Sequence, residues 1–173
     1  AATFDDVYAQ IEQLGAATGH VADAAGVVAK MQIDIAAAVA AAPARTKGLT
    51  YYHELDDTYY SVTSHTFLGA VYGLFGLTNI ADAGPAGNDY PQLSSEFIVQ
   101  QDPALIFLAD TKCCGQTAQT VAARPGWDAI TAVKDGAGVV AMDDDIASRW
   151  GPRIVDYITA VSAALTKVPA PTG

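Results

Sequence analysis

Polar side chains that can bind ligands or ions follow three short apolar segments of the chain. These polar runs are residues 53–57, 110–114 and 143–145, and the apolar segments before them are expected strands. The carboxyl ends of parallel strands open at one edge of a sheet, where open α/β sheets bind their ligands. We therefore expect the three runs to form one rim. The candidate ligand contacts on this rim are His53, Glu54, Tyr59 and Lys112.

Two histidines, His53 and His65, lie in or near this rim. Either could bind haem iron together with Tyr59 or Tyr90, since His and Tyr are both haem ligands, or could simply form hydrogen bonds within a loop. The three consecutive carboxylates at 143–145 lack EF-hand spacing and cannot all face one ion, so we interpret them as a solvated acidic turn. We predict no bound metal ion and no resident cofactor.

The two cysteines of the chain, Cys113 and Cys114, are adjacent. They could close a vicinal disulfide in an oxidising compartment or remain thiols. A thiol-dependent enzyme would use one as its nucleophile with His53 or His65 as the base, and Lys112 would lower the thiol pKa. The chain contains no GxSxG, HExxH, P-loop or GxGxxG motif, and such motifs mark common enzyme classes. We therefore predict a binding protein and not an enzyme, with a thiol-dependent enzyme or redox module as the alternative.

The composition indicates a globular chain with an acidic surface. Its 173 residues are 51% hydrophobic and 16% charged, which suffices for one well-buried core. The formal net charge is −10, and Lys and Arg are scattered rather than gathered in a basic stripe. This pattern excludes nucleic acid as an expected partner. The Ala-rich stretch at 35–42 is too short to cross a bilayer, so we expect no membrane span.

Strands and helices are expected to alternate through most of the chain. Apolar runs predict strands at 49–55, 104–109 and 138–142 and a further extended piece at 58–62. Helical spacing predicts helices at 66–76, 94–101, 116–123, 127–133 and 152–165. Two helices come first, 3–18 with Thr3 as N-cap and 21–42 ending before Pro43. The order predicts an α/β fold: a three-layer α/β/α, Rossmann-like lobe with a mostly parallel sheet, preceded by two helices.

Four segments, in order and spacing, resemble one known family. They are EQLGAATGH, NDYPQLSSEFIVQQDPALIFLAD, AARPGWDAITAVKDGAGVVAMDDD and SRWGPRIVDYI. The chain thereby resembles the ABC-transporter substrate-binding proteins of the iron-siderophore, haem and vitamin B12 group, periplasmic binding proteins whose two lobes are joined by one long helix. The resemblance implies that residues 1–19 end an N-terminal lobe, 20–43 form the interlobe linking helix and 44–173 form the C-terminal lobe. It also implies an N-terminal lobe of similar size in the parent protein.

The resemblance assigns three residues of the second segment. Tyr90 matches an aromatic residue that packs on the ligand, and Gln92 either follows it into the cleft or hydrogen-bonds within the loop. Glu96 matches the glutamate that pairs with arginines of the membrane permease, or else only supports its own helix. An exposed carboxylate in the first turn of a helix is favoured by the helix dipole.

The last segment bears on the identity of the ligand. Arg149 matches a family position from which a guanidinium in the cleft would bind carboxylates or the anionic donors of a chelate. Trp150 is either a wall of the pocket or a core residue. Ile146 stands where corrinoid-binding relatives have a tryptophan, which weakens a corrinoid assignment. The resemblance therefore implies capture of an iron chelate, a ferric siderophore or haem.

The same resemblance implies partners and a location. The expected partners are the chelate and the membrane subunits of an ABC permease. The expected location is extracytoplasmic, in the periplasm or cell envelope, with a lipid anchor on the full-length parent. The apolar face of residues 4–42 would lack its normal partner without the N-terminal lobe, so we expect the chain to form a dimer.

Overall fold

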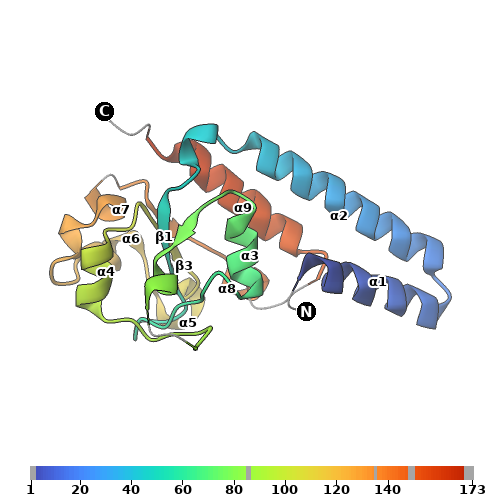
Figure 1. Ribbon diagram of the computed structural model, residues 1–173, viewed down its shortest axis with the longest axis horizontal. Helices are drawn as coiled ribbons and strands as arrows, with labels where there is room; N and C mark the ends of the chain where they lie inside the picture. The colour runs from blue at the N-terminus through green and yellow to red at the C-terminus, as the bar shows by residue number, and fades with distance from the viewer. Residues whose placement is uncertain (1–2, 85–86, 135, 148–150, 170–173) are drawn as a thin grey trace.

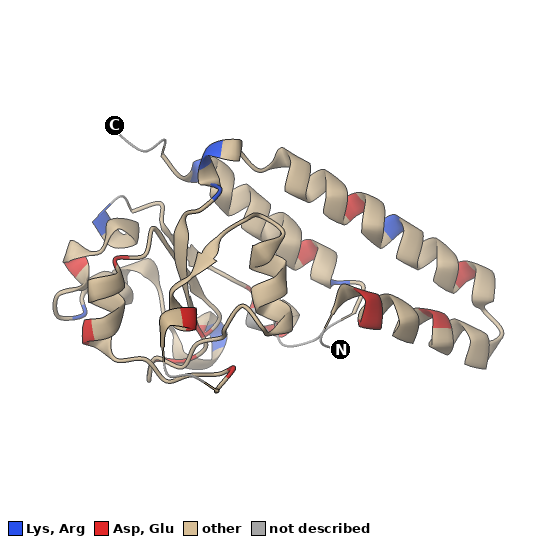
Figure 2. Ribbon diagram, in the orientation of Figure 1, with Lys and Arg blue, Asp and Glu red and all other residues tan. Residues whose placement is uncertain are grey.

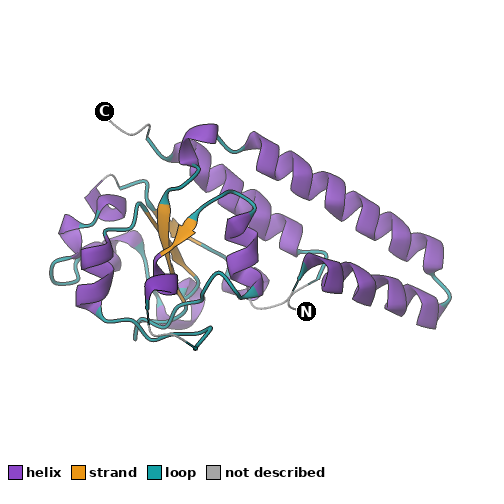
Figure 3. Cartoon of the chain, in the orientation of Figure 1, coloured by secondary structure: helices purple, strands orange, loops and turns teal. Residues whose placement is uncertain are grey.

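The computed structural model describes residues 3–84, 87–134, 136–147 and 151–169. At its centre is a parallel sheet of four strands in the order β2-β1-β3-β4 (Figure 3). The strands are β1 Thr50–Glu54, β2 Thr78–Asn79, β3 Leu105–Leu108 and β4 Val139–Ala141. Every residue of β3 is buried, as the continuous apolar run predicted for a central parallel strand.

Helices cover both faces of this sheet (Figure 1). On one side α3 (Phe67–Gly73) and α9 (Ile154–Lys167) enclose a core around Tyr51, Tyr72 and Phe107. On the other side α4 (Ser95–Gln101), α6 (Ala118–Ala122) and α7 (Thr131–Lys134) enclose a second core around Trp127 and Ile106. The remaining short elements are η1 (Ala44–Thr46), η2 (Ile80–Ala83), η3 (Trp127–Ala129), α5 (Thr111–Cys114) and α8 (Asp144–Ala147). The predicted three-layer α/β/α architecture is confirmed.

The first two helices form a hairpin that extends from the lobe (Figure 1). Helix α1 (Phe4–Thr18) begins with a capping box in which Thr3 and Asp6 bond each other's backbone N–H groups. Helix α2 (Val21–Ala41) packs along α9, where the Ser162 hydroxyl donates to the Ala38 carbonyl over 2.6 Å. A Cβ added at Gly15 would lie 2.3 Å from the Cβ of Ala24, so the hairpin closes tightly only around glycine.

Helix α2 is long and apolar enough, by length and composition, to span a membrane. Length and composition alone do not make a span, so the expectation of no membrane span stays a prediction. Val28, Met31 and Ile35 of this helix are buried in the protein. Acidic side chains are spread over the hairpin and the lobe (Figure 2).

The extended piece predicted at 58–62 does not enter the sheet. It pairs instead with residues 89–93, through an antiparallel bridge between Tyr60 and Gln92. The Ser61 amide donates to the Pro91 carbonyl, and the Leu93 amide donates to the Tyr59 carbonyl. The two-residue strand β2 and the single-turn helices α5 and α8 were not predicted, since so few residues carry no periodicity to recognise.

Candidate functional site

The carboxyl ends of β1 and β3 lie side by side at the point where the strand order reverses. The chain leaves β1 toward β2 on one side, and leaves β3 toward β4 on the other. Glu54 is in register with Leu108, and the Ala109 amide donates to the Glu54 carbonyl over 2.9 Å. Such switch points form the crevices in which open α/β sheets bind ligands.

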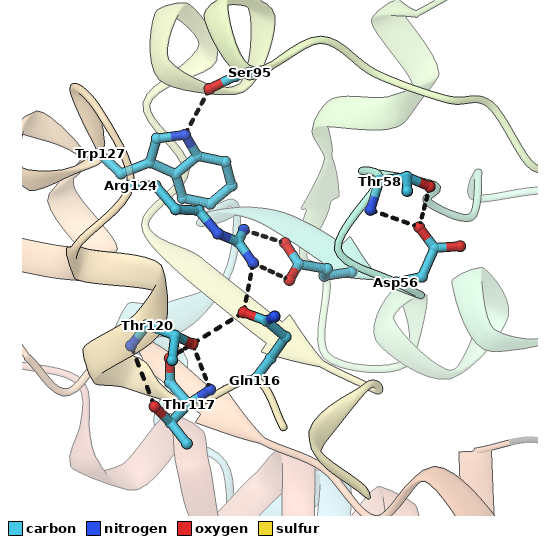
Figure 4. A network of polar contacts seen from close by, with 9 residues as sticks. Asp56, Thr58, Ser95, Gln116, Thr117, Thr120, Arg124 and Trp127 are labelled. Carbon is cyan, nitrogen blue, oxygen red and sulfur yellow. Dashed lines mark hydrogen bonds and ion pairs between the residues drawn. The ribbon is translucent and has the colours of Figure 1, made fainter. Parts of the chain in front are cut away.

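A buried ion pair lies at the carboxyl end of β1, next to this switch point. The Arg124 guanidinium donates to both Glu54 carboxylate oxygens over 2.6 Å, and the Glu54 side chain is fully buried. Arg124 also donates to the Gln116 amide oxygen over 2.8 Å, and it lies 4.5 Å from the centre of the Trp127 ring (Figure 4). The charge of Arg124 is therefore satisfied within the protein, by bidentate hydrogen bonds and by an aromatic face.

Aromatic packing extends the same network toward the rim and toward helix α4. The Tyr59 ring stacks on Trp127 with centroids 5.6 Å apart, and Arg124 lies 5.3 Å from the Tyr59 centroid. Tyr59 adopts a φ of +70°, a left-handed conformation that is unfavourable for a residue with a Cβ. The Trp127 indole donates to the Ser95 hydroxyl over 2.7 Å. These contacts fix Tyr59 as a wall of the crevice.

Asp110 is the unpaired acid of the site. Its side chain is fully buried directly after β3, and neither carboxylate oxygen has a hydrogen-bond partner. Burial and the neighbouring negative charge of Glu54 raise the pKa of Asp110 to about 7. Near neutral pH this carboxyl group therefore titrates between its protonated and its charged form.

The predicted rim residues Tyr90 and Gln92 are both exposed at the edge of the lobe. The Tyr90 side chain is 47% exposed, and Tyr60, which pairs with Gln92 on the facing segment, is 39% exposed. Gln92 uses its amide N–H to donate to the Thr58 carbonyl over 3.0 Å. The paired segments thus present two tyrosine rings and an amide to solvent.

Lys112 is turned to the opposite side of the rim. Its ammonium group bonds Asp143 at 2.6 Å and Asp145 at 3.0 Å, and both hydrogen bonds raise the pKa of Lys112. The solvated acidic turn predicted at 143–145 is therefore a partner of this lysine. The side chains of Lys112, Asp143 and Asp145 are all about half exposed, so these two ion pairs lie at the surface.

His53 cannot be the ligand contact proposed for it, because it is fully buried in the core. Its Nδ1 lies 2.8 Å from the Tyr72 hydroxyl, which in turn lies 2.6 Å from the Tyr157 hydroxyl. Burial lowers the pKa of His53 to about 4. Glu54, predicted as an exposed contact, is likewise buried and already paired with Arg124. Alternation along β1 explains the error for His53, because a buried central strand directs side chains into both cores.

The other predicted residues fall in three places. His65 is exposed, 3.6 Å from the Asp89 carboxylate, on a polar hollow of about 480 Å³. Glu96 is exposed in the first turn of α4, whose N-cap Ser94 accepts from the Phe97 amide. Arg149 and Trp150 lie outside the described residues.

The cysteine pair is exposed at the end of α5, and neither residue forms a disulfide. The hydrogen bond that the Cys114 thiol donates to Cys113, its desolvation and the nearby carboxylates Asp110 and Asp57 raise the pKa of Cys114 to about 12. Lys112, which was expected to lower the thiol pKa, is engaged by Asp143 and Asp145. A thiol nucleophile requires the opposite shift, so the local electrostatics disfavour the thiol-enzyme alternative.

Arg124 and Trp127 are the site residues that sequence reasoning missed. Both lie in the ARPGW segment, which carried part of the family resemblance but no assigned role. The signal was a cation and a tryptophan on either side of Pro125 and Gly126, although Asp128 is the acid nearest to Arg124 in the sequence. Its partner Glu54 is 70 residues away, so only the fold could identify it.

Comparison with known proteins places these features in a family. Residues 1–145 match the family model described as periplasmic binding protein. A cobalamin-binding protein from Halobacterium salinarum is 31% identical over 169 residues, which cover 95% of this chain and 45% of that protein. An uncharacterized ABC transporter substrate-binding lipoprotein, YvrC from Bacillus subtilis, is 28% identical over 95% of this chain and 51% of its own length. The chain spans about half the length of these curated relatives.

Among solved structures, a possible iron-binding, periplasmic solute-binding protein from Staphylococcus epidermidis superposes with a TM-score of 0.82. It is 21% identical, and the match covers 95% of this chain and 63% of that one, which supports the fold. All three relatives are described as binding proteins, and the prediction of a binding protein rather than an enzyme is confirmed. Because the family model covers most of the chain, the chain belongs to the periplasmic binding protein family.

Proposed function

We propose that this chain is the C-terminal lobe of the substrate-binding component of an ABC importer, and that its cargo is an iron chelate, a ferric siderophore or haem. In this proposal residues 1–19 end the N-terminal lobe, 20–43 link the lobes and 44–173 form the lobe that we describe. The observation that carries the proposal is the exposed pair Tyr90 and Tyr60 with Gln92 beside them, at the carboxyl edge of the sheet.

The chemistry of this edge suits a large, flat ligand. Exposed tyrosine rings offer apolar faces with a polar hydroxyl at the end, which suits stacking on a macrocycle or an aryl chelator. Tyr59, held by Trp127 and Arg124, supplies a rigid wall behind them. Arg124 itself is committed to Glu54, so anionic groups of the ligand are assigned to Arg149, with Trp150 as a further wall.

A corrinoid is the second candidate cargo. The relative from Halobacterium salinarum, described as cobalamin-binding, is 31% identical to this chain. A corrinoid is also a flat macrocycle that aromatic residues can cover. Ile146, in place of the tryptophan expected for corrinoid binding, is the residue that argues for the iron chelate instead.

Glu96 is the proposed contact with the permease. Its carboxylate lies in the first turn of α4, on the edge of a shallow pocket of about 340 Å³. The pocket is lined by Ser95, Glu96, Val99, Gln100, Pro125 and Gly126. An arginine of the permease would place its guanidinium on the carboxylate and its apolar stem in the pocket.

The proposed location is extracytoplasmic, with the parent protein anchored by lipid as the lipoprotein YvrC is described to be. We also propose that the chain as it stands forms a dimer through the helical hairpin. Leu14 and Ile33 are 66% and 68% exposed on α1 and α2, and exposed apolar surface of this kind drives association. Light scattering across a wide concentration range tests this, and a monomer at every concentration contradicts it.

The cargo is tested by titrating the chain separately with haemin, a ferric tris-catecholate siderophore and cyanocobalamin. Ligand absorbance and tryptophan fluorescence report binding. We expect saturable binding of an iron chelate, and Tyr90→Ala should weaken it about tenfold, because a stacking aromatic face is lost. Thr159→Ala, an exposed substitution on α9 outside the rim and the hairpin, is the control and should leave affinity unchanged.

The possible results separate the proposals. Binding of cyanocobalamin alone would replace the iron chelate by the second candidate. Binding of none of the three, with an intact fold by circular dichroism, would contradict both assignments. Equal loss of affinity in Tyr90→Ala and Thr159→Ala would contradict the rim as the binding surface.

A further inference from the structure

The adjacent thiols of Cys113 and Cys114 lie close to the carboxyl end of β3. They are the last two residues of α5, which begins directly after Asp110 at the carboxyl end of β3. Both side chains are exposed, and the two thiols are hydrogen-bonded to each other. Asp57, from the loop that follows β1, and Asp110 act electrostatically on Cys114. The thiol pair therefore lies between the loops that leave the two central strands.

A disulfide between these thiols is incompatible with the backbone of α5. Adjacent Cα atoms are about 3.8 Å apart across a trans peptide, whereas unstrained disulfides join Cα atoms about 4.4 to 6.8 Å apart. Closing the eight-membered ring therefore requires rotation of the backbone away from helical angles. Strained and exposed disulfides of this kind belong to the labile, regulatory class rather than the structural one.

The backbone that would have to rotate also positions a residue of the buried network. The amides of Cys114 and Gln116 both donate to the Asp110 carbonyl, and Gly115 between them has a φ of +68°. The left-handed conformation of Gly115 ends the helix, and the Asp110 carbonyl accepts from the amides on both sides of it. Immediately after it, the Gln116 amide oxygen accepts from Arg124 over 2.8 Å and from Thr120 over 2.9 Å.

We propose that Cys113 and Cys114 are a reversible oxidation site, whose closure to a vicinal disulfide unwinds α5 and withdraws Gln116 from Arg124. The oxidant is a small-molecule disulfide. One thiolate attacks it and releases one thiol, and the second cysteine then displaces the other, so two cysteine thiols become one disulfide while one disulfide becomes two thiols. The relevance of the site rests on the proposed extracytoplasmic location, where disulfides persist.

The reaction is slow at neutral pH and faster in alkali. The attacking species is the thiolate, and the mutual hydrogen bond together with the carboxylates keeps Cys114 protonated. Once one cysteine carries the mixed disulfide, the other is the adjacent residue, so ring closure is intramolecular and needs no second oxidant molecule. Ring closure must also rotate the α5 backbone away from helical angles.

The test compares the reduced chain with the chain treated with oxidised glutathione. Because the chain holds only two cysteines, intact mass and alkylation report their state without ambiguity. We expect a product lighter by two hydrogens that resists alkylation and is restored by dithiothreitol. In that product the Cys114 and Gln116 amides should exchange hydrogen at least about tenfold faster, since their bonds to Asp110 are lost.

A second measurement follows the buried network itself. The indole N–H resonance of Trp127, assigned with a Trp150→Phe variant, should shift on oxidation, because Arg124 lies against the Trp127 ring. In Cys114→Ser the same treatment should produce neither the ring-closed mass nor the shift of the indole resonance.

Two results would overturn the proposal. One is a stable glutathione adduct or a disulfide-linked dimer in place of the ring-closed product. The other is a ring-closed product whose amide exchange and indole resonance match those of the reduced chain. None of these readouts uses a ligand, so failure here is distinct from failure of the iron-chelate assignment.

Discussion

Replacing the unpaired acid Asp110 by asparagine should stabilise the protein increasingly as the pH rises. The folded protein holds the pKa of Asp110 at about 7, far above its ordinary 3.8. Between these values the folded state binds a proton that the unfolded state has released. Stability therefore falls as the pH rises through this window, because the folded state binds more protons than the unfolded state.

The magnitude follows from the displacement of the pKa. Each pH unit between the two pKa values corresponds to about 1.4 kcal/mol. From pH 5 to pH 8 the wild-type protein should lose roughly 2 to 3 kcal/mol of unfolding free energy relative to the variant. An asparagine side chain is uncharged at every pH, as the protonated acid is, so the variant keeps the neutral form throughout this window.

Urea unfolding at pH 5, 6, 7 and 8, analysed by linear extrapolation, measures this difference. Titrating groups remote from Asp110 are common to both proteins, so their contributions cancel, whereas the interaction of Asp110 with Glu54 is part of the measured difference. Glu12→Gln, at an exposed acid of α1 far along the chain from Asp110, serves as the control for a change of net charge. Parallel pH profiles for wild-type and Asp110→Asn would refute the reasoning, since they would show that Asp110 ionises as it does in the unfolded chain.

Three further variants test the fold around the site. Arg124→Met should cost roughly 3 to 5 kcal/mol in urea unfolding, because it leaves Glu54 charged and buried without a partner, and adding Glu54→Gln should recover part of the loss. Gly69→Ala should cost several kcal/mol in thermal unfolding, since its Cβ would lie 2.2 Å from the Thr63 carbonyl oxygen. Ser94→Ala should cost about 1 kcal/mol through loss of the α4 N-cap, and an unchanged melting temperature would contradict that capping role.

Local patterns predicted much of the fold. The buried run that became β3 and the capped helix α4 were recognisable because their signals are contained in a few neighbouring residues. Thr3 and Ser94 act as N-caps as predicted, through bonds to amides three residues away. The extended piece at 58–62 was recognisable as extended, but its partner at 89–93 was not, because strand pairing is non-local.

In the candidate site, too, local motifs were predictable from the sequence and contacts between distant segments were not. The rim position of Tyr90 followed from a family motif, whereas the burial of His53 and Glu54 did not follow from their position after an apolar run. A strand that lies between two other strands, with helices on both faces of the sheet, is buried on both faces. The sequence of the strand alone does not reveal which strands and helices will surround it. The ion pair of Glu54 with Arg124 joins segments that the sequence treats as unrelated.

By itself, then, the sequence determined the α/β class, the leading helical hairpin, the family resemblance and the position of the cysteine pair, since each depends on composition, periodicity or short motifs. The tertiary structure alone decided which polar groups are exposed and which are buried. It made Asp110 an unpaired acid, Arg124 an internal counter-ion and Cys114 a poor nucleophile. The physical reason is that desolvation and charge pairing depend on distances through space, which chain packing sets and local sequence does not.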